Sequence, residues 1–211
     1  MRKIFLRQSN YLIEFGDSNI KTIRFNDSKA YRLFSLNVIN SIIFSINNEE
    51  VDLEKYGMII FNPFQIDLNE KKFLNLVYKK LEKSIRDEER RFIADIEKSS
   101  LCLFEKLALV SDIPIDYNDT FDFNRFFSAF DVKIMEPEDY LDKIVRYIRL
   151  SCEILHTKLF VSFGLLALLD KAEIDLLNKE LNQYDVSLLD VFYNEKSNIE
   201  TLYIDTDWCI I

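Results

Sequence analysis

The stretch K-L-F-V-S-F at residues 158–163 constrains the fold of this chain more than any other feature. Its apolar side chains do not alternate with polar ones, which is typical of a strand covered on both faces of a sheet. Apolar residues at helical spacing precede it over residues 141–155, and D-K-A-E from Asp170 is a capping box that begins a second helix. A further apolar strand at 186–191 completes a strand–helix–strand crossover. We therefore expect two parallel neighbours in an α/β sheet.

Glycine is scarce, and this limits the chemistry that such a sheet can support. Only Gly16, Gly57 and Gly164 occur, and the sequence contains neither G-x-x-x-x-G-K-[ST] nor G-x-G-x-x-G. Loops that cradle phosphate depend on glycine at those positions. A sheet of nucleotide-binding shape would here lack its nucleotide site, so we predict no nucleotide cofactor.

Composition and charge narrow the classes of protein to which this chain can belong. The 211 residues are 48% hydrophobic and 30% charged, which suits a folded globular chain with one core and a smaller lobe. No apolar run approaches the roughly 20 residues of a membrane span, and residues 1–15 lack a signal-peptide pattern. Cys102, Cys152 and Cys209 are far apart and read as small buried hydrophobes in a reducing compartment. We expect a cytoplasmic protein whose net charge of −9 confines any DNA site to a local basic patch.

Periodicity divides the chain into a sheet-forming part and a helical part. Residues 11–15 and 20–25 predict an antiparallel hairpin about a turn at 16–19, and residues 42–46 and 57–61 predict further strands. Asn69 is the expected N-cap of a helix that leaves the sheet, residues 92–107 predict a second helix, and Pro137 is expected at N1 of the helix before residue 156. We therefore predict a discontinuous α/β head domain at 1–67 and 156–211, with a helical leg at 68–155.

Three stretches, taken together, resemble a known family. They are M-I-I-F-N-P-F-Q-I-D-L-N-E-K-K-F-L-N from Met58, K-L-F-V-S-F with the following D-K-A-E helix, and Y-I-D-T-D-W-C-I from Tyr203. In order and spacing they are similar to the Csn-two family of type II-A CRISPR-associated spacer-acquisition accessory proteins, although this chain looks shorter. The resemblance implies a RecA-like head sheet without Walker motifs, an inserted helical leg and a homotetrameric ring. It also implies calcium at acidic sites near the leg, linear double-stranded DNA bound through the ring, no catalysis, and the spacer integrase and RNA-guided effector nuclease as partners.

A basic stripe on the first leg helix is the candidate DNA site. On an ideal helix continued from Asn69, five cations share one face opposite the apolar positions, as phosphate binding requires. The alternative is an ordinary solvated face, supported by the Glu82 to Arg86 spacing of four. A shorter row, Lys143, Arg146 and Arg149, is the weaker candidate. The five stripe residues are Lys72, Lys79, Lys83, Arg86 and Arg90.

An acidic loop is the candidate calcium site. Asp116, Asn118, Asp119 and Asp122 place oxygen donors close together, as Ca²⁺ prefers, and Glu105 is a candidate distant ligand. The loop lacks the glycine and terminal glutamate of an EF-hand. The alternative is therefore local turn chemistry together with a cap for the following helix, expected at 121–130.

Other chemistry-bearing residues are interpreted structurally. His156 is the only histidine and follows a helix end, and Asp205 with Asp207 lacks the third acid of a metal nuclease. We read Trp208 and the phenylalanines at 121–130 as subunit interface. Two functions remain: a non-catalytic ring protein that binds double-stranded DNA and its ends to assist CRISPR spacer acquisition, or an α/β protein-interaction scaffold without direct DNA binding.

Overall fold

The computed structural model describes residues 1–112, 114, 116–118, 120–194 and 201–210. It divides into two units, which are described separately. The head unit comprises Met1–Leu68 and Glu136–Ile211, and the leg unit comprises Asn69–Met135. No helix in the described ranges is long and apolar enough to cross a membrane.

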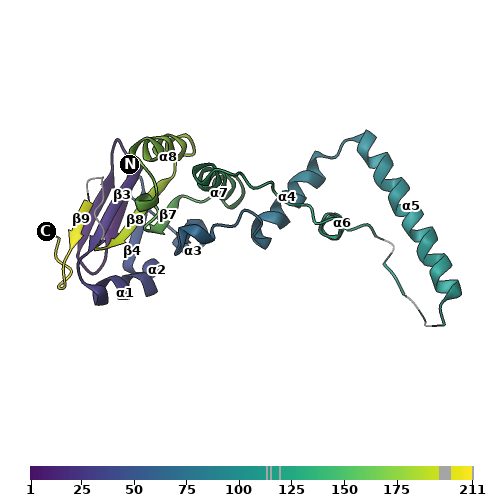
Figure 1. The fold of residues 1–211 in the computed structure, drawn as a ribbon, viewed down its shortest axis with the longest axis horizontal. Coiled ribbons are helices and arrows are strands. Elements are labelled where there is room, and N and C mark those ends of the chain that lie inside the picture. The colour runs from purple at the N-terminus through teal and green to yellow at the C-terminus, as the bar shows by residue number, and fades with distance from the viewer. Residues whose placement is uncertain (113, 115, 119, 195–200, 211) are drawn as a thin grey trace. The chain divides into compact units, whose positions relative to one another are not determined.

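A five-stranded parallel sheet organises the head unit (Figure 1). The predicted central strand is an interior one, β7, which pairs in parallel with β6 on one side and β8 on the other. All five residues of β7 are buried, as its unbroken apolar pattern predicts. The strand order is β6-β7-β8-β3-β9, with bounds β3 Ile20–Phe25, β6 Gly57–Ile60, β7 Leu159–Phe163, β8 Ser187–Tyr193 and β9 Thr201–Ile204. The predicted α/β class and the parallel crossover are confirmed.

A second, antiparallel sheet corrects the predicted N-terminal hairpin. The hairpin forms between β1 and β2, whereas β3 leaves it and pairs in parallel with β8. The reason is burial: Ile23 and Phe25 of β3 are fully covered, so β3 belongs inside a sheet that is packed on both faces. The strand order is β2-β1-β4-β5, with bounds β1 Arg2–Leu6, β2 Tyr11–Phe15, β4 Ile42–Ile46 and β5 Glu49–Val51.

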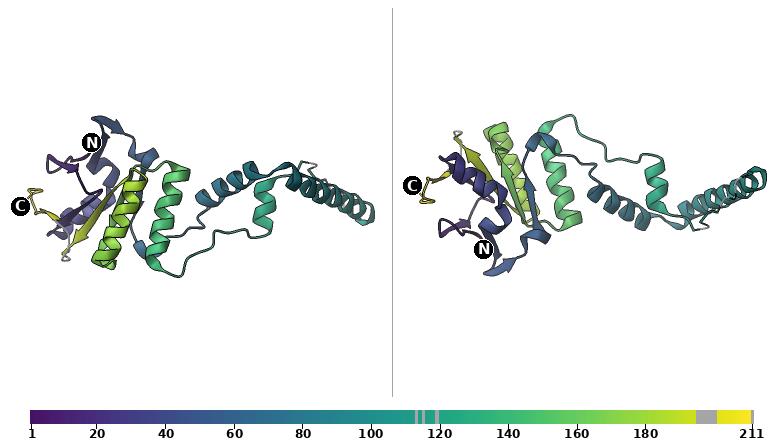
Figure 2. Two further views of the ribbon diagram at one scale, coloured as in Figure 1. Left: turned by 90° about the horizontal axis from the view of Figure 1, so that it is seen from above. Right: turned by 90° about the horizontal axis from the view of Figure 1, so that it is seen from below.

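Helix α7, predicted as part of the leg, belongs to the head unit. It lies beside α8 (Figure 2) and buries Ile144 and Ile148, and Arg149 of α7 forms a salt bridge of 3.4 Å with Glu180 of α8. Asp139 caps α7, so Pro137 lies before the helix and not at N1. The head helices are α1 Ser28–Leu36, α2 Val38–Ser41, α3 Leu53–Tyr56, α7 Tyr140–Leu155 and α8 Lys171–Gln183, with 3-10 turns η1 Pro63–Gln65 and η2 Leu166–Leu168.

The leg unit contains α4 Lys71–Ser84, α5 Asp87–Val110 and α6 Phe123–Ala129. Asn69 does not cap α4: its side chain bonds the backbone of Ile134 instead, and Glu70 occupies the N-cap. Helix α6 packs on α4, where the Tyr78 hydroxyl donates to the Val132 carbonyl at 2.7 Å. Helix α5 has no fully buried residue.

Trp208, predicted at a subunit interface, packs partly within its own chain. Its ring lies 5.5 Å from that of Phe25, at the edge of the head core, so this chain already covers part of it. In the leg unit, Phe126 packs on Phe121 and Phe130, and Phe127 packs on Tyr78. These phenylalanines thus form a local aromatic cluster that is partly covered, and Phe130 keeps 71% of its surface exposed.

Candidate nucleic-acid interface and neighbouring sites

The basic stripe is present on α4, with three of its five predicted members. At 100° per residue, Lys72, Lys79 and Lys83 lie within about 40° of one another. All three are exposed, and the opposite side of α4 buries Phe73 and Tyr78 against the leg core. Lys72 also forms a 2.7 Å salt bridge with Glu70, so Lys79 and Lys83 are the more available cations.

Arg86 and Arg90 do not continue this stripe, because the helix ends between them and Lys83. Helix α4 stops at Ser84, and Arg86 is the N-cap of α5. The backbone N–H of Arg86 donates to the Glu89 carboxylate at 2.9 Å, which fixes the start of the new helix. Both arginines are exposed, but they belong to a second helix with its own direction.

The weaker candidate row, on α7, is engaged in ion pairs and other contacts. Lys143 lies 2.9 Å from Glu136, and Arg149 lies 3.4 Å from Glu180. Arg146 also has an interaction within the chain. Because carboxylates already compensate part of this row, it offers less free positive charge to a phosphate backbone than the α4 stripe does.

The described members of the acidic loop serve the local backbone. The Asp116 carboxylate accepts from the N–H of Tyr117, and the Asn118 side chain accepts from both the N–H and the hydroxyl of Thr120. Asp122 caps α6, as the alternative interpretation predicted. Asp119 lies outside the described residues. Among the residues that are described, no three His, Cys, Asp or Glu side chains gather as a metal cluster.

A carboxylate that sequence reasoning missed, Glu97, faces this loop. It lines a cavity of about 510 Å³ together with Asn118 and Asp122, while Tyr117 packs on Phe104 of α5 at 5.6 Å. Glu105, the predicted distant ligand, is exposed elsewhere on α5. Glu97 and Leu101 share one face of α5 because they are four residues apart, but that spacing alone does not indicate that this face meets the loop.

In the middle of β8, the buried side chain of Asp190 binds backbone groups that follow the carboxyl end of β7. Its carboxylate accepts hydrogen bonds from the Ser162 hydroxyl at 2.6 Å and from the backbone N–H groups of Leu165 and Leu166 at 3.1 and 2.7 Å. Such N–H groups after a parallel strand bind anionic ligands in other α/β proteins. Here the chain supplies its own anion, and the absence of a glycine-rich motif agrees with that arrangement.

Burial raises the pKa of the Asp190 carboxyl from 3.8 to about 6, and the hydrogen bonds from Ser162, Leu166 and Leu165 offset part of the rise. Because this pKa is higher in the folded than in the unfolded chain, the folded state is favoured by protonation. This stabilisation of the folded state is complete below 3.8, the pKa of the carboxyl in the unfolded chain. It disappears as the pH rises through about 6, its pKa in the folded chain.

We therefore expect titration of Asp190 to lower the free energy of unfolding by about 2 kcal/mol as the pH rises from 4 to 6, at 1.36 kcal/mol per pKa unit. Urea denaturation at several pH values measures this slope. Asp190→Asn cannot titrate, so its unfolding free energy should vary less over the same window. An identical pH profile in the variant would contradict the assignment.

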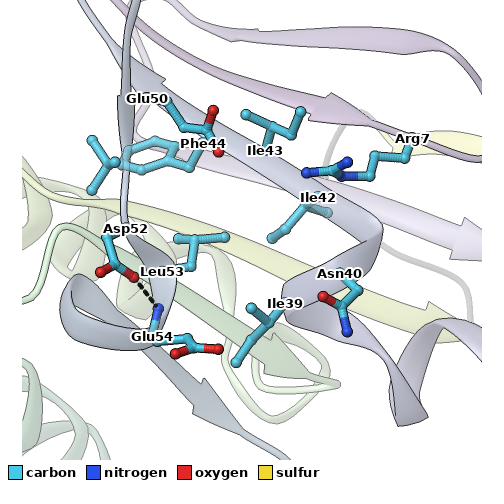
Figure 3. Close-up of a pocket in the computed structure, with 11 residues that line it drawn as sticks. Arg7, Ile39, Asn40, Ile42, Ile43, Phe44, Glu50, Asp52, Leu53 and Glu54 are labelled. Carbon is cyan, nitrogen blue, oxygen red and sulfur yellow. Dashed lines mark hydrogen bonds between the residues drawn. The ribbon is translucent and has the colours of Figure 1, made fainter.

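A cavity of about 440 Å³ lies on the antiparallel sheet, between α2 and α3 (Figure 3). Its charged lining consists of Arg7 with Glu50, Asp52 and Glu54. Asp52 caps α3 through the N–H of Glu54 at 2.9 Å and is therefore structurally committed. The described residues that line this cavity contain no nucleophile–base pair, so its chemistry does not indicate catalysis.

The cysteines differ from their predicted burial. Cys102 and Cys209 are exposed and only Cys152 is half-buried, where burial raises its pKa to about 12. A thiol with so high a pKa is a poor nucleophile at neutral pH.

His156 and Asp205 have structural roles, as the sequence predicted. His156 is the C-cap of α7 with φ 57°, and the Asp205 carboxylate closes a turn by accepting from the N–H groups of Asp207 and Cys209.

Together these features define an α/β protein with an inserted helical unit, in which Asp190 holds two N–H groups after β7 and three exposed lysines share one face of α4. The family model described as CRISPR-associated protein (Cas_Csn2) matches residues 36–208. The chain belongs to this Csn2 family, as its sequence motifs predicted. Membership implies a role in CRISPR adaptation.

Two further comparisons add little to this assignment. No curated protein matches the chain in sequence. Among solved structures, it is similar to the ADP conformation of MJ1267, an ATP-binding cassette of an ABC transporter, with 10% identity and a TM-score of 0.44. That match covers 100% of this chain and 89% of the other, and a likeness at this level supports no inference about activity.

Proposed function

We propose that this protein is a non-catalytic homotetrameric ring that binds linear double-stranded DNA, ends included, during spacer acquisition. The observation that carries the proposal is the exposed stripe of Lys72, Lys79 and Lys83 on α4. Cations on one face of a helix suit a phosphate backbone, and such contacts are independent of base sequence. The spacer integrase and the RNA-guided effector nuclease are the proposed partners.

A net charge of −9 is compatible with this role if the cations line the hole and the acids cover the outside. A tetramer repeats the α4 stripe four times around the DNA, so a modest stripe becomes a strong site. The log of the affinity should then fall with the log of the salt concentration by about 0.9 per neutralised phosphate.

The exposed apolar surface of helix α5 supports the proposal of an assembly, because much of that surface is left uncovered by its own chain. Five exposed apolar residues lie within about 60° of one another at 100° per residue, along a helix of 24 residues. The face opposite carries Arg91, Lys98 and Glu105. A stripe of this kind is typical of helices that pack against another helix. Its members are Phe92, Ile96, Leu103, Leu107 and Val110, here called the α5 stripe.

The α5 stripe also suits the second candidate function, a scaffold that contacts only other proteins. A contiguous exposed apolar surface marks an interaction site, whether the partner is another copy of the chain or a different protein. DNA binding separates the two candidates. The proposed ring captures linear DNA and must thread onto it, whereas the scaffold is indifferent to DNA; competition between linear and covalently closed DNA therefore tests the proposed function.

We expect calcium to bind at the acidic loop, with Asp116 and Asp119 among its ligands. Asp116→Ala combined with Asp119→Ala should weaken calcium binding and loosen the assembly, because a hard cation needs six to eight oxygen ligands. Calorimetric titration with calcium measures the affinity, and Glu105→Ala shows whether the distant acid takes part. Unchanged affinity in the double variant would leave the loop with turn and capping roles only.

A further inference from the structure

Aromatic rings gather where the parallel strands of the head unit end. Phe61 follows β6 directly, Phe163 is the last residue of β7, and Tyr193 is the last residue of β8. Because β6, β7 and β8 are parallel neighbours, their carboxyl ends meet at one edge of the sheet. Tyr31 of α1 joins them: its ring lies 6.0 Å from Phe163 and 5.4 Å from Tyr193. We call these four residues the aromatic platform.

Phe61 is the most exposed ring of the platform. Phe61 stacks on Phe163 at 5.3 Å, with only 13° between the ring planes. Phe163 is 8% exposed, whereas Phe61 keeps 61% of its surface exposed. One face of Phe61 therefore covers Phe163, and much of the remaining surface is open. Phe64 repeats the arrangement nearby, with 72% exposure and a stack of 6.1 Å and 30° on Tyr140.

The position of the platform specifies the kind of ligand. α/β sheets bind ligands at the carboxyl edge of their strands, but Asp190 already occupies the N–H groups of Leu165 and Leu166 there. A phosphate is therefore not held at that point, while a planar ring can extend the stack on Phe61. Exposed cations, Lys29 and Arg32, lie on α1, which begins at this same edge after β3. Exposed aromatic rings on which bases can stack are typical of surfaces that bind unpaired nucleic acid strands.

We propose that the aromatic platform binds unpaired nucleobases at the end of a DNA strand, with the base stacked on Phe61. The proposal rests on the proposed function and adds to it a reason for distinguishing DNA ends: the α4 stripe contacts duplex backbone without regard to sequence, and the platform takes bases that have left the duplex. Binding at the platform is sequence-tolerant, because every base has a planar face.

The test uses the full-length protein and a short duplex with a single-stranded 3′ tail that carries 2-aminopurine. Stacking on Phe61 should quench the fluorescence of 2-aminopurine in the tail, and the tailed duplex should bind more tightly than a blunt one. Phe61→Ala should remove the quenching and lower affinity for the tail by about fivefold or more, since one stacked base contributes about 1–3 kcal/mol.

Matched variants separate stacking from apolar contact and from misfolding. Phe61→Leu keeps an apolar side chain without a flat ring and should also lose the quenching, whereas Phe61→Trp should retain it. Leu36→Ala changes another exposed apolar residue of the head unit, 74% exposed, and should bind like the parent.

The outcomes distinguish the two proposals. Duplex binding with no preference for the tail, or equal quenching in Phe61→Ala, overturns the platform and leaves the proposed function standing. Tail binding that depends on Phe61, without duplex binding, supports the platform and overturns the ring. Loss of assembly in Phe61→Ala with unchanged tail affinity would assign the platform to a protein contact and overturn its role with bases. Failure to bind either DNA overturns both.

Discussion

Charge reversal at Lys79 and Lys83 is expected to abolish binding of linear DNA while the protein stays folded and assembled. The two ammonium groups are exposed on α4, so their replacement by Glu should change the free energy of unfolding by less than about 0.5 kcal/mol. In a tetramer the double substitution removes eight cations and adds eight carboxylates along one DNA path. Repulsion of the phosphate backbone then replaces attraction, and the salt dependence of binding should vanish with the binding itself.

Lys171→Glu with Lys179→Glu is the matched control for this experiment. Both lysines are exposed on α8 of the head unit, and their reversal changes the net charge by the same amount. The control should keep most of its affinity in an electrophoretic mobility shift. If Lys79→Glu with Lys83→Glu bound DNA with the parent affinity and salt slope, the stripe would be solvated surface. A DNA site would then have to lie elsewhere, with Lys143, Arg146 and Arg149 as the remaining candidate row.

The second large effect is expected at the α5 stripe. Leu103→Glu combined with Leu107→Glu should dissociate the assembly into smaller species, because a carboxylate buried without a partner costs several kcal/mol. Each 1.4 kcal/mol lowers an association constant tenfold. Two unpaired charges per chain should therefore lower the association constant by several powers of ten. The two leucines are 53% and 48% exposed in the single chain, which leaves its own core largely unaffected.

Size-exclusion chromatography with light scattering measures the molar mass of each variant. Lys98→Glu combined with Cys102→Glu adds two carboxylates to the α5 surface away from the stripe and should leave the mass unchanged. Circular dichroism confirms that both proteins remain folded. A Leu103→Glu, Leu107→Glu protein with the parent mass would show that α5 does not carry the assembly contact.

The elements that local patterns define well were predictable from the sequence. The β7–α8–β8 crossover has an unbroken apolar strand, a capping box at Asp170 and a second apolar strand, and each of these signals depends on neighbours in the chain. The pairing of β3 was not predictable in the same way. Its turn at 16–19 favours a hairpin locally, whereas contacts with β8 decide its position.

The candidate sites show the same division between local and long-range information. The spacing of Lys72, Lys79 and Lys83 places them together on any helix. Helix α4 ends at Ser84, however, and a new helix with an acidic first turn begins at Asp87, so the stripe stops there. Asp190 was hidden inside an apolar strand, and only the fold brings the N–H groups of η2 to its carboxylate.

The central claim, that the protein forms a ring around linear DNA, is tested most directly by competition. A labelled linear duplex is bound by the parent protein and then challenged with unlabelled DNA of equal length, either linear or covalently closed. The account predicts that linear DNA displaces the label efficiently and that closed circles compete poorly, because a closed ring needs a free end to thread. Equal competition by the two forms would contradict the ring.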